Sequence, residues 1–154
     1  EMKLVVLAGA LGLAAAGFAT AAPAAAQDAA PVYTGLFNNT AVGGYDAVSF
    51  FEGEPVRGDR NFSTEYMGAE FRFANQANLD RFLADPAAFA PQYGGYCAWA
   101  MAQGYSAKGD PRHWRIVDGK LYLNFNARIQ SQWEADIPGF IEAADRNFPT
   151  VIAD

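Results

Sequence analysis

Cysteine and histidine are almost absent from this chain, which has one of each, Cys97 and His113, among its 154 residues. A single cysteine excludes an intramolecular disulfide. It also excludes the structural zinc sites that are built from four cysteines, or from two cysteines and two histidines. A metal site in this chain must therefore recruit other side chains or be completed by a second molecule.

Basic residues are also few. Lys and Arg number 11 against 17 Asp and Glu, which gives a formal net charge of −6 and an isoelectric point near 4.7. Surfaces that follow a nucleic-acid backbone or an anionic membrane normally carry an excess of positive charge. We therefore expect no nucleic-acid partner and no contact of the mature protein with a membrane.

Several catalytic signatures are missing. The chain has no phosphate-binding loop, no G-x-S-x-G sequence and no H-E-x-x-H sequence. No internal repeat is visible. A mass of 16.6 kDa suits one domain and excludes a large multidomain enzyme. We favour a protein that is not an enzyme.

The N-terminal segment has the pattern of a secretory signal peptide. Lys3 is followed by an uncharged, Ala-rich run over 4–27, which contains the Ala-x-Ala cleavage pattern at 24–26. We predict a signal peptide over 1–26, export to the periplasm, and a flexible lead-in over 27–40. The alternative is that the run is retained as a membrane anchor, since it is long enough to span a bilayer.

Strand signals are concentrated in two places. Aromatic and polar residues alternate over 62–73 around a glycine, which predicts a hairpin. A second hairpin is predicted over 115–123, because Asp118 and Gly119 form the preferred two-residue turn. The apolar segment 47–51 predicts a further short strand.

Apolar residues three or four apart predict helices between and after these strands. They are expected after a cap at Asn75 or Asn78, over 96–103, around 129–133, and between Pro138 and Pro149. Strands and helices occur in blocks without regular alternation. The predicted fold is a single α+β domain in which a small antiparallel sheet, built from β-hairpins, packs against short helices.

The lone cysteine is the strongest candidate for chemistry. Cys97 follows Gly94 and Gly95 at the start of a predicted helix, where free N–H groups and the helix dipole favour a thiolate. Met101 lies four residues later, on the same side of that helix. Since soft sulfur ligands select Cu(I), we predict a copper site formed by Cys97, Met101 and His113.

Two other hypotheses stay open at this stage. In the first, Cys97 is the nucleophile of a thiol-dependent enzyme or redox protein, with His113 as its base. In the second, Cys97 is structural and the protein is a binding domain. The aromatic residues Tyr93, Tyr96 and Trp99 would then line a groove for a small apolar or amphipathic ligand or for a protein.

Several segments carry a family resemblance. GYDAVSFF at 44–51, YMGAEFRF at 66–73, PQYGGYCA at 91–98 and DGKLYLN at 118–124 resemble the secreted YHS domain-containing proteins. The resemblance implies a YHS-like domain over 41–149, followed by a C-terminal tail over 150–154.

The same resemblance implies a metal-related role, with copper as the metal and Cys97 as the matching position. Members of the wider YHS group often use several cysteines as ligands. This chain has one, so a periplasmic partner protein or a second copy in a homodimer would complete the site.

Overall fold

The computed structural model describes residues 29–152, so the predicted signal peptide lies outside the described part of the chain. Within it, no helix is both long and apolar enough to cross a bilayer. The strands are β1 (Asp59–Tyr66), β2 (Ala69–Phe73), β3 (Asp110–Val117) and β4 (Lys120–Asn124). The α-helices are α1 (Gln76–Ala84), α2 (Pro86–Phe89), α3 (Ala98–Gln103), α4 (Ala127–Glu134) and α5 (Ile137–Val151). Short 3₁₀ helices are η2 (Val42–Gly44), η3 (Ala47–Glu52) and η4 (Gln92–Gly95).

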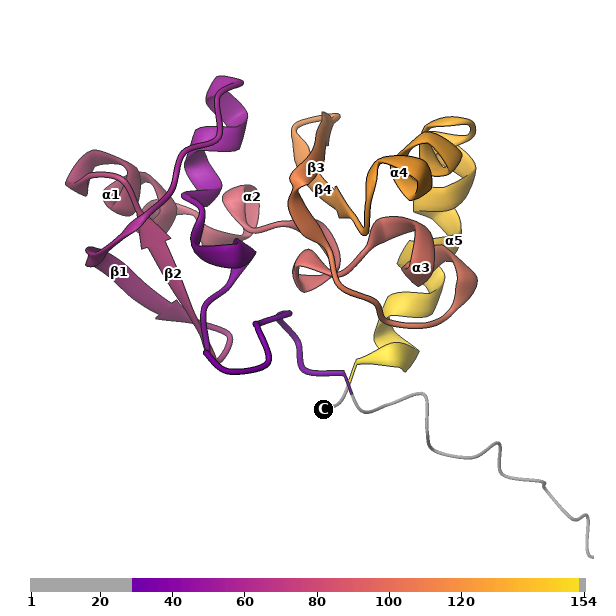
Figure 1. Cartoon of the computed structure of the whole chain (residues 1–154), viewed down its shortest axis with the longest axis horizontal. Helices are drawn as coiled ribbons and strands as arrows, with labels where there is room; N and C mark the ends of the chain where they lie inside the picture. Colours follow the sequence, from indigo (N-terminus) through magenta and orange to yellow (C-terminus); the bar gives the residue numbers. More distant parts are fainter. Residues whose placement is uncertain (1–28, 153–154) are drawn as a thin grey trace, which may run out of the picture.

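The predicted α+β class is confirmed. The strands pair as two antiparallel hairpins, β1–β2 and β3–β4, and each hairpin is a sheet of its own. In Figure 1, β1, β2 and α1 lie on the left, while β3, β4 and helices α3, α4 and α5 lie on the right. The small sheet expected from the sequence is therefore divided between two halves of the molecule. The first half contains β1, β2 and α1, and the second half contains β3, β4, α3, α4 and α5.

Both hairpins form because their turns suit them. Met67 and Gly68 connect β1 to β2 with φ of 50° and 84°, and Asp118 and Gly119 connect β3 to β4 with φ of 49° and 73°. Positive φ at both central residues is the geometry of the two-residue turn that matches strand twist. The two hairpin predictions are confirmed.

Helix starts also follow the sequence. The side chain of Asn75 accepts a hydrogen bond from the Asn78 N–H at 2.9 Å and caps α1. Asn126 accepts from the Ile129 N–H at 2.8 Å and caps α4. Each cap satisfies a backbone donor that has no partner within the helix. Asn75 is therefore the cap among the two candidates.

Two local predictions are wrong. Residues 47–51 form helix η3 instead of a strand, because the preceding Asp46 side chain accepts from two N–H groups of its first turn. Helix α5 continues through Pro149 to Val151. Val151 is buried, and its burial keeps the last turn of the helix against the core.

The segment predicted as a lead-in contacts the folded body where the structure describes it. The Tyr33 N–H donates to the Gly94 carbonyl at 2.9 Å, and Val32 is buried. Ala29 bridges to Ile152 at the end of α5. The segment is therefore ordered by contacts that are distant in the sequence.

The two halves repeat one another, which corrects the expectation of no internal repeat. Asp59 and Asp110 open β1 and β3, an offset of 51 positions (110 − 59). The same offset separates the turn glycines, Gly68 and Gly119, and the helix caps, Asn75 and Asn126. Strand register repeats as well, including an irregularity after each of the two aspartates.

Each copy of the repeat begins with a strained turn, which precedes η3 in the first half and α3 in the second. Val42 and Tyr93 have φ of 55° and 58°, and each is followed by two glycines with positive φ. Such φ values are rare for residues with a side chain and cost about 1–3 kcal/mol. The repeat is not visible in the sequence because the identical residues are scattered turn and cap positions. Most core residues at matched positions differ in type.

One core holds the halves together. Phe50, Phe71 and Phe82 of the first half pack in a single buried cluster with Leu121 and Leu123 of β4. A second cluster, around Met101 and Trp133, lies within the second half. The shared first cluster makes the two halves one domain.

Candidate functional site

Cys97 lies at the start of α3, as predicted. It occupies the capping position, and Gly104 ends the helix in the left-handed conformation with φ of 93°. Gly94, in the turn before Cys97, has φ of 63°, and a Cβ there would lie 2.0 Å from the Pro31 carbonyl oxygen. Only glycine fits this close approach, so the turn before Cys97 is fixed by its packing against the N-terminal segment.

The Cys97 thiol is buried and neutral. The residue is 1% exposed, and Sγ donates to the Asn124 side-chain oxygen at 3.5 Å. Burial raises the pKa of the thiol, although the backbone N–H groups of Ala100, Phe125 and Trp99 act in the opposite direction. The predicted thiolate is therefore wrong, because the desolvation of a charged sulfur outweighs the N–H groups at the helix start.

A small apolar pocket opens beside the thiol. Its volume is about 220 Å³. It is lined by Cys97, Trp99, Ala100, Tyr105, Ala107, Phe125 and Ile129. We call this space the Cys97 pocket. The rim residues Tyr105 and Phe125 are exposed, so the pocket reaches solvent.

The other two predicted metal ligands do not line the Cys97 pocket. Met101 is fully buried in the second core cluster, together with Tyr122 and Trp133. His113 lies on β3. The Met101 backbone N–H donates to the Cys97 carbonyl at 3.0 Å, as expected within a helix. In the part of the chain that is described, no side-chain hydrogen bond joins Met101 or His113 to the Cys97 sulfur, and no three His, Cys, Asp or Glu side chains gather around a common point.

Of the three aromatic residues predicted to bind a ligand, only Trp99 lines the Cys97 pocket. Tyr93 donates to the Asp145 carboxylate at 2.9 Å, and burial raises its pKa far above the ordinary value. Tyr96 donates to the Ala30 carbonyl at 2.9 Å. Tyr93 and Tyr96 therefore anchor α5 and the N-terminal segment.

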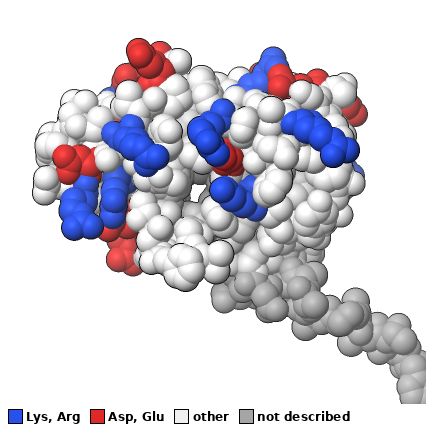
Figure 2. Space-filling model, in the orientation of Figure 1, with Lys and Arg blue, Asp and Glu red and all other residues white. Residues whose placement is uncertain are grey.

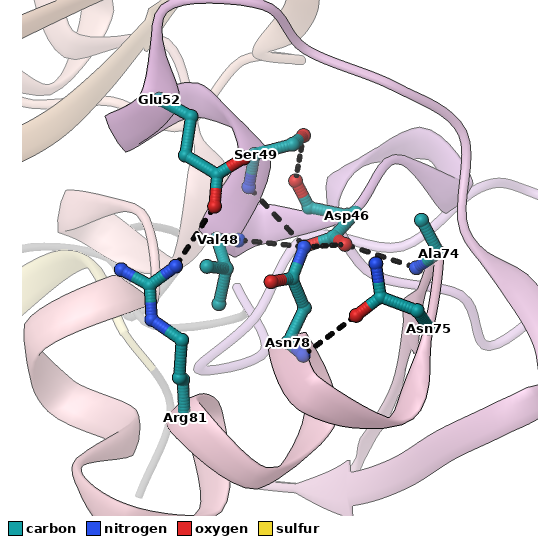
Figure 3. A network of polar contacts seen from close by, with 8 residues as sticks. All are labelled: Asp46, Val48, Ser49, Glu52, Ala74, Asn75, Asn78 and Arg81. Carbon is teal, nitrogen blue, oxygen red and sulfur yellow. Dashed lines mark hydrogen bonds and ion pairs between the residues drawn. The ribbon is translucent and has the colours of Figure 1, made fainter.

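A buried carboxylate, which was not among the predicted site residues, organises the first half (Figure 3). Asp46 is 0% exposed and accepts from the N–H groups of Val48 and Ala74 at 2.8 and 2.9 Å. It also accepts from the Asn78 side-chain amide at 2.7 Å and from the Ser49 N–H at 3.2 Å. A buried carboxylate requires this degree of hydrogen bonding to offset its desolvation. The sequence signal was its position, since aspartate is a preferred helix cap.

Asp46 and Cys97 occupy the same place in the repeat (97 − 46 = 51). The N–H groups of Val48, Ser49 and Ala74 around the carboxylate correspond to those of Trp99, Ala100 and Phe125 around the thiol.

The fourth donor is lost in the second half, because Asn78 is replaced there by Ile129, a residue that lines the Cys97 pocket. Cys97 and Ile129 therefore stand in the second half where Asp46 and Asn78 stand in the first. They leave an apolar space in place of the polar network.

Comparison with known proteins identifies the first half. Residues 47–93 match the family model of the YHS domain, so the chain contains a YHS domain and the resemblance is confirmed for this segment. YHS domains are associated with metal, in particular copper. No curated protein and no solved structure matched the chain.

The match bears directly on the predicted metal site. It ends four residues before Cys97 (97 − 93), and the matched segment contains neither cysteine nor histidine. The oxygen that accepts from the Cys97 thiol belongs to Asn124, and it also accepts from the Trp99 N–H at 3.1 Å. The residues around Cys97 therefore do not fit a resident copper ion, which prefers several soft or imidazole ligands.

Proposed function

We propose that this YHS domain-containing chain is a binding protein without catalytic activity, and that the Cys97 pocket holds a small apolar molecule. Its predicted signal peptide supports export to the periplasm as part of the same proposal. The observation that carries the proposal is the pocket itself. It is an apolar space, open to solvent, at the point where the first half of the repeat is filled by a polar network.

The lining defines the ligand class. Trp99, Tyr105 and Phe125 offer aromatic surface, and Ile129 offers aliphatic surface. A cavity of roughly 150 Å³ is enough to bind benzene. A volume of about 220 Å³ suits one aromatic ring or a short branched hydrocarbon, with few polar groups.

The neutral thiol argues against the thiol-enzyme hypothesis. The thiolate is the attacking species in cysteine catalysis, and burial raises the pKa of Cys97. His113, the proposed base, does not line the pocket. Cys97 therefore contributes a small, weakly polar side chain to the lining of the pocket.

Binding can be tested by nuclear magnetic resonance with indole as the probe. We expect saturable shifts of the Trp99, Ala100 and Phe125 amide signals, because these residues surround the pocket. Ala107→Leu places a larger side chain in the pocket and should abolish the shifts. Ala88→Leu, on the exposed face of α2, is the matched control and should leave them unchanged.

The proposal fails if indole causes no saturable shifts at these amides. It also fails if Ala107→Leu, shown to be folded by its spectrum, binds indole as the wild type does. Shifts spread over both halves would indicate general surface binding and would equally contradict it.

A further inference from the structure

A large polar hollow lies where the two halves of the repeat and the N-terminal segment meet. Its volume is about 540 Å³. It is lined by Tyr33, Gly35, Asn38, Thr40, Gly43, Gly44, Arg57, Gly58, Arg72, Lys108, Gly109 and Pro111. We call it the central hollow. Figure 2 shows this face of the molecule hollowed near its middle, with Lys and Arg side chains on either side.

The central hollow carries positive charge without carboxylates in its lining. Of its three cations, Arg72 pairs with Glu70. Arg57 and Lys108 form no ion pair with a carboxylate of residues 29–152, and Arg57 lies over the Tyr45 ring, 5.0 Å from its centre. Two uncompensated cations face one hollow in a chain whose net charge is −6.

These two cations occupy one position of the repeat (108 − 57 = 51). The backbone of Arg57 forms an isolated antiparallel β-bridge with that of Tyr45, and the backbone of Lys108 forms the same bridge with that of Tyr96. Each half therefore directs its equivalent cation toward the same space. A positive side chain is present at both places, although most other matched positions differ in type.

A second, smaller hollow extends the positive surface. It shares Arg57 and Lys108 with the central hollow and adds Arg112. The one carboxylate in its lining, Asp110, accepts two hydrogen bonds from the Arg112 guanidinium, at 3.1 and 2.7 Å. Its negative charge is therefore balanced locally and leaves the charges of Arg57 and Lys108 free.

We propose that the central hollow binds a small organic dianion, of the phosphomonoester or dicarboxylate type, between Arg57 and Lys108. Two free cations match two negative charges, and arginine and lysine are the usual partners of such oxyanions. The polar side chains of Asn38 and Thr40 lie in the same lining and offer hydrogen bonds. The volume exceeds that of an oxyanion alone, so it leaves room for an organic part. This proposal does not depend on the Cys97 pocket.

The test is a calorimetric titration of the folded protein at pH 7.5 and constant ionic strength, with glycerol 3-phosphate and succinate as separate probes. We expect one saturable site for at least one probe, and the preferred probe separates the phosphate source from the carboxylate source. Arg57→Gln and Lys108→Gln should each weaken that binding about tenfold, and the double variant should abolish it.

Arg60→Gln and Lys120→Gln are matched controls. Both residues are exposed, form no ion pair in the described part of the chain, and lie outside the hollow. They should change the affinity less than twofold. The proposal is overturned if neither probe binds at 10 mM, roughly the weakest affinity expected of a built site. It is also overturned if the controls weaken binding as much as the hollow variants, which would indicate a diffuse charge effect.

Discussion

At the scale of single residues, positions 46 and 97 show how one backbone arrangement serves two different side chains. Three N–H groups converge at each place. Asp46 uses them, with Asn78, to keep a buried charge fully hydrogen-bonded. Cys97 needs none of them, because a neutral thiol is a weak acceptor and tolerates an apolar neighbour. The exchange of one polar pair for an apolar one converts a structural network into a pocket.

Asp46→Asn should therefore destabilise the protein strongly. The amide keeps one acceptor oxygen but turns an NH₂ group toward buried donors such as the Ala74 N–H. Leaving buried donors without acceptors should lower the free energy of unfolding by about 3 kcal/mol, measured by urea denaturation. Glu54→Gln, at an exposed position, removes a charge without this network and should change it by less than about 0.5 kcal/mol. Equal effects would contradict the role given to Asp46.

Copper uptake provides a second residue-scale prediction. Because the neighbours of Cys97 do not fit a metal ion, the reduced protein and Cys97→Ser should bind Cu(I) with the same affinity. Competition titration against a chromogenic chelator measures both. Tighter binding by the wild type, lost in Cys97→Ser, would overturn the assignment of Cys97 to an apolar pocket and restore the copper hypothesis.

The Asp110–Arg112 pair predicts a pH dependence. Hydrogen bonding from Arg112 lowers the pKa of Asp110 to about 2 from the ordinary value of 3.8. A carboxyl whose folded pKa is depressed stabilises the protein above its unfolded pKa, and this contribution disappears as the pH falls from about 4 to about 2. Since Arg112 is exposed, solvent weakens the pair, and we expect its contribution to the free energy of unfolding to be small.

Asp110→Asn should lower the free energy of unfolding at pH 7 and lose that effect near pH 2, in urea titrations across this range. Asp59→Asn is the matched control, because Asp59 occupies the same place in β1. Within residues 29–152, its side chain accepts from one backbone N–H, that of Asn61, and from no guanidinium. Its effect should vary less with pH. A deficit of Asp110→Asn that persists unchanged at pH 2 would contradict the assignment.

At the scale of elements, the sequence predicted the turns and helix caps that depend on neighbouring residues. The turn at Asp118 and Gly119 and the cap at Asn75 depend on residues within three positions, so both were visible. Helix η3 was missed because four consecutive residues, Ala47 to Phe50, are buried, which a strand pattern also allows. The Cys97 pocket was missed for a different reason. It depends on Ile129 and Phe125, which only the tertiary fold brings to Cys97.

The β1–β2 turn offers an improvement at this scale. Met67 has φ of 50°, which is an unfavourable backbone conformation for a residue with a side chain. The residue is 58% exposed, so its side chain buries little apolar surface. Asn-Gly is the preferred pair for this turn, and Met67→Asn should raise the free energy of unfolding by about 0.5–1 kcal/mol in urea denaturation. Asp118→Asn starts from a suitable residue and should change it by less than half as much. A loss of stability in Met67→Asn would show that Met67 makes contacts that this geometry does not account for.

At the scale of the whole molecule, the repeat places its two most distinctive spaces in different settings. The Cys97 pocket lies within the second half, whereas the central hollow is lined by equivalent residues from both halves and by the N-terminal segment. The central hollow therefore requires both halves to be present. The YHS match covers only one of them, which means that the matched segment alone lacks Lys108 and the Cys97 pocket.

The shared core predicts that the two halves unfold together. Leu123 belongs to β4 but is buried in the cluster that contains Phe50, Phe71 and Phe82 of the first half. Leu123→Ala leaves a cavity in that cluster and should cost about 3 kcal/mol. Native-state hydrogen exchange should then show the slowest amides of both hairpins losing the same opening free energy, since one cooperative unit carries both. Leu83→Ala, at a half-exposed position of α1, is the control and should cost less than about 1 kcal/mol. A loss confined to β3 and β4 would mean that the halves are independent units, and the central hollow would then lie at a movable boundary instead of within one rigid core.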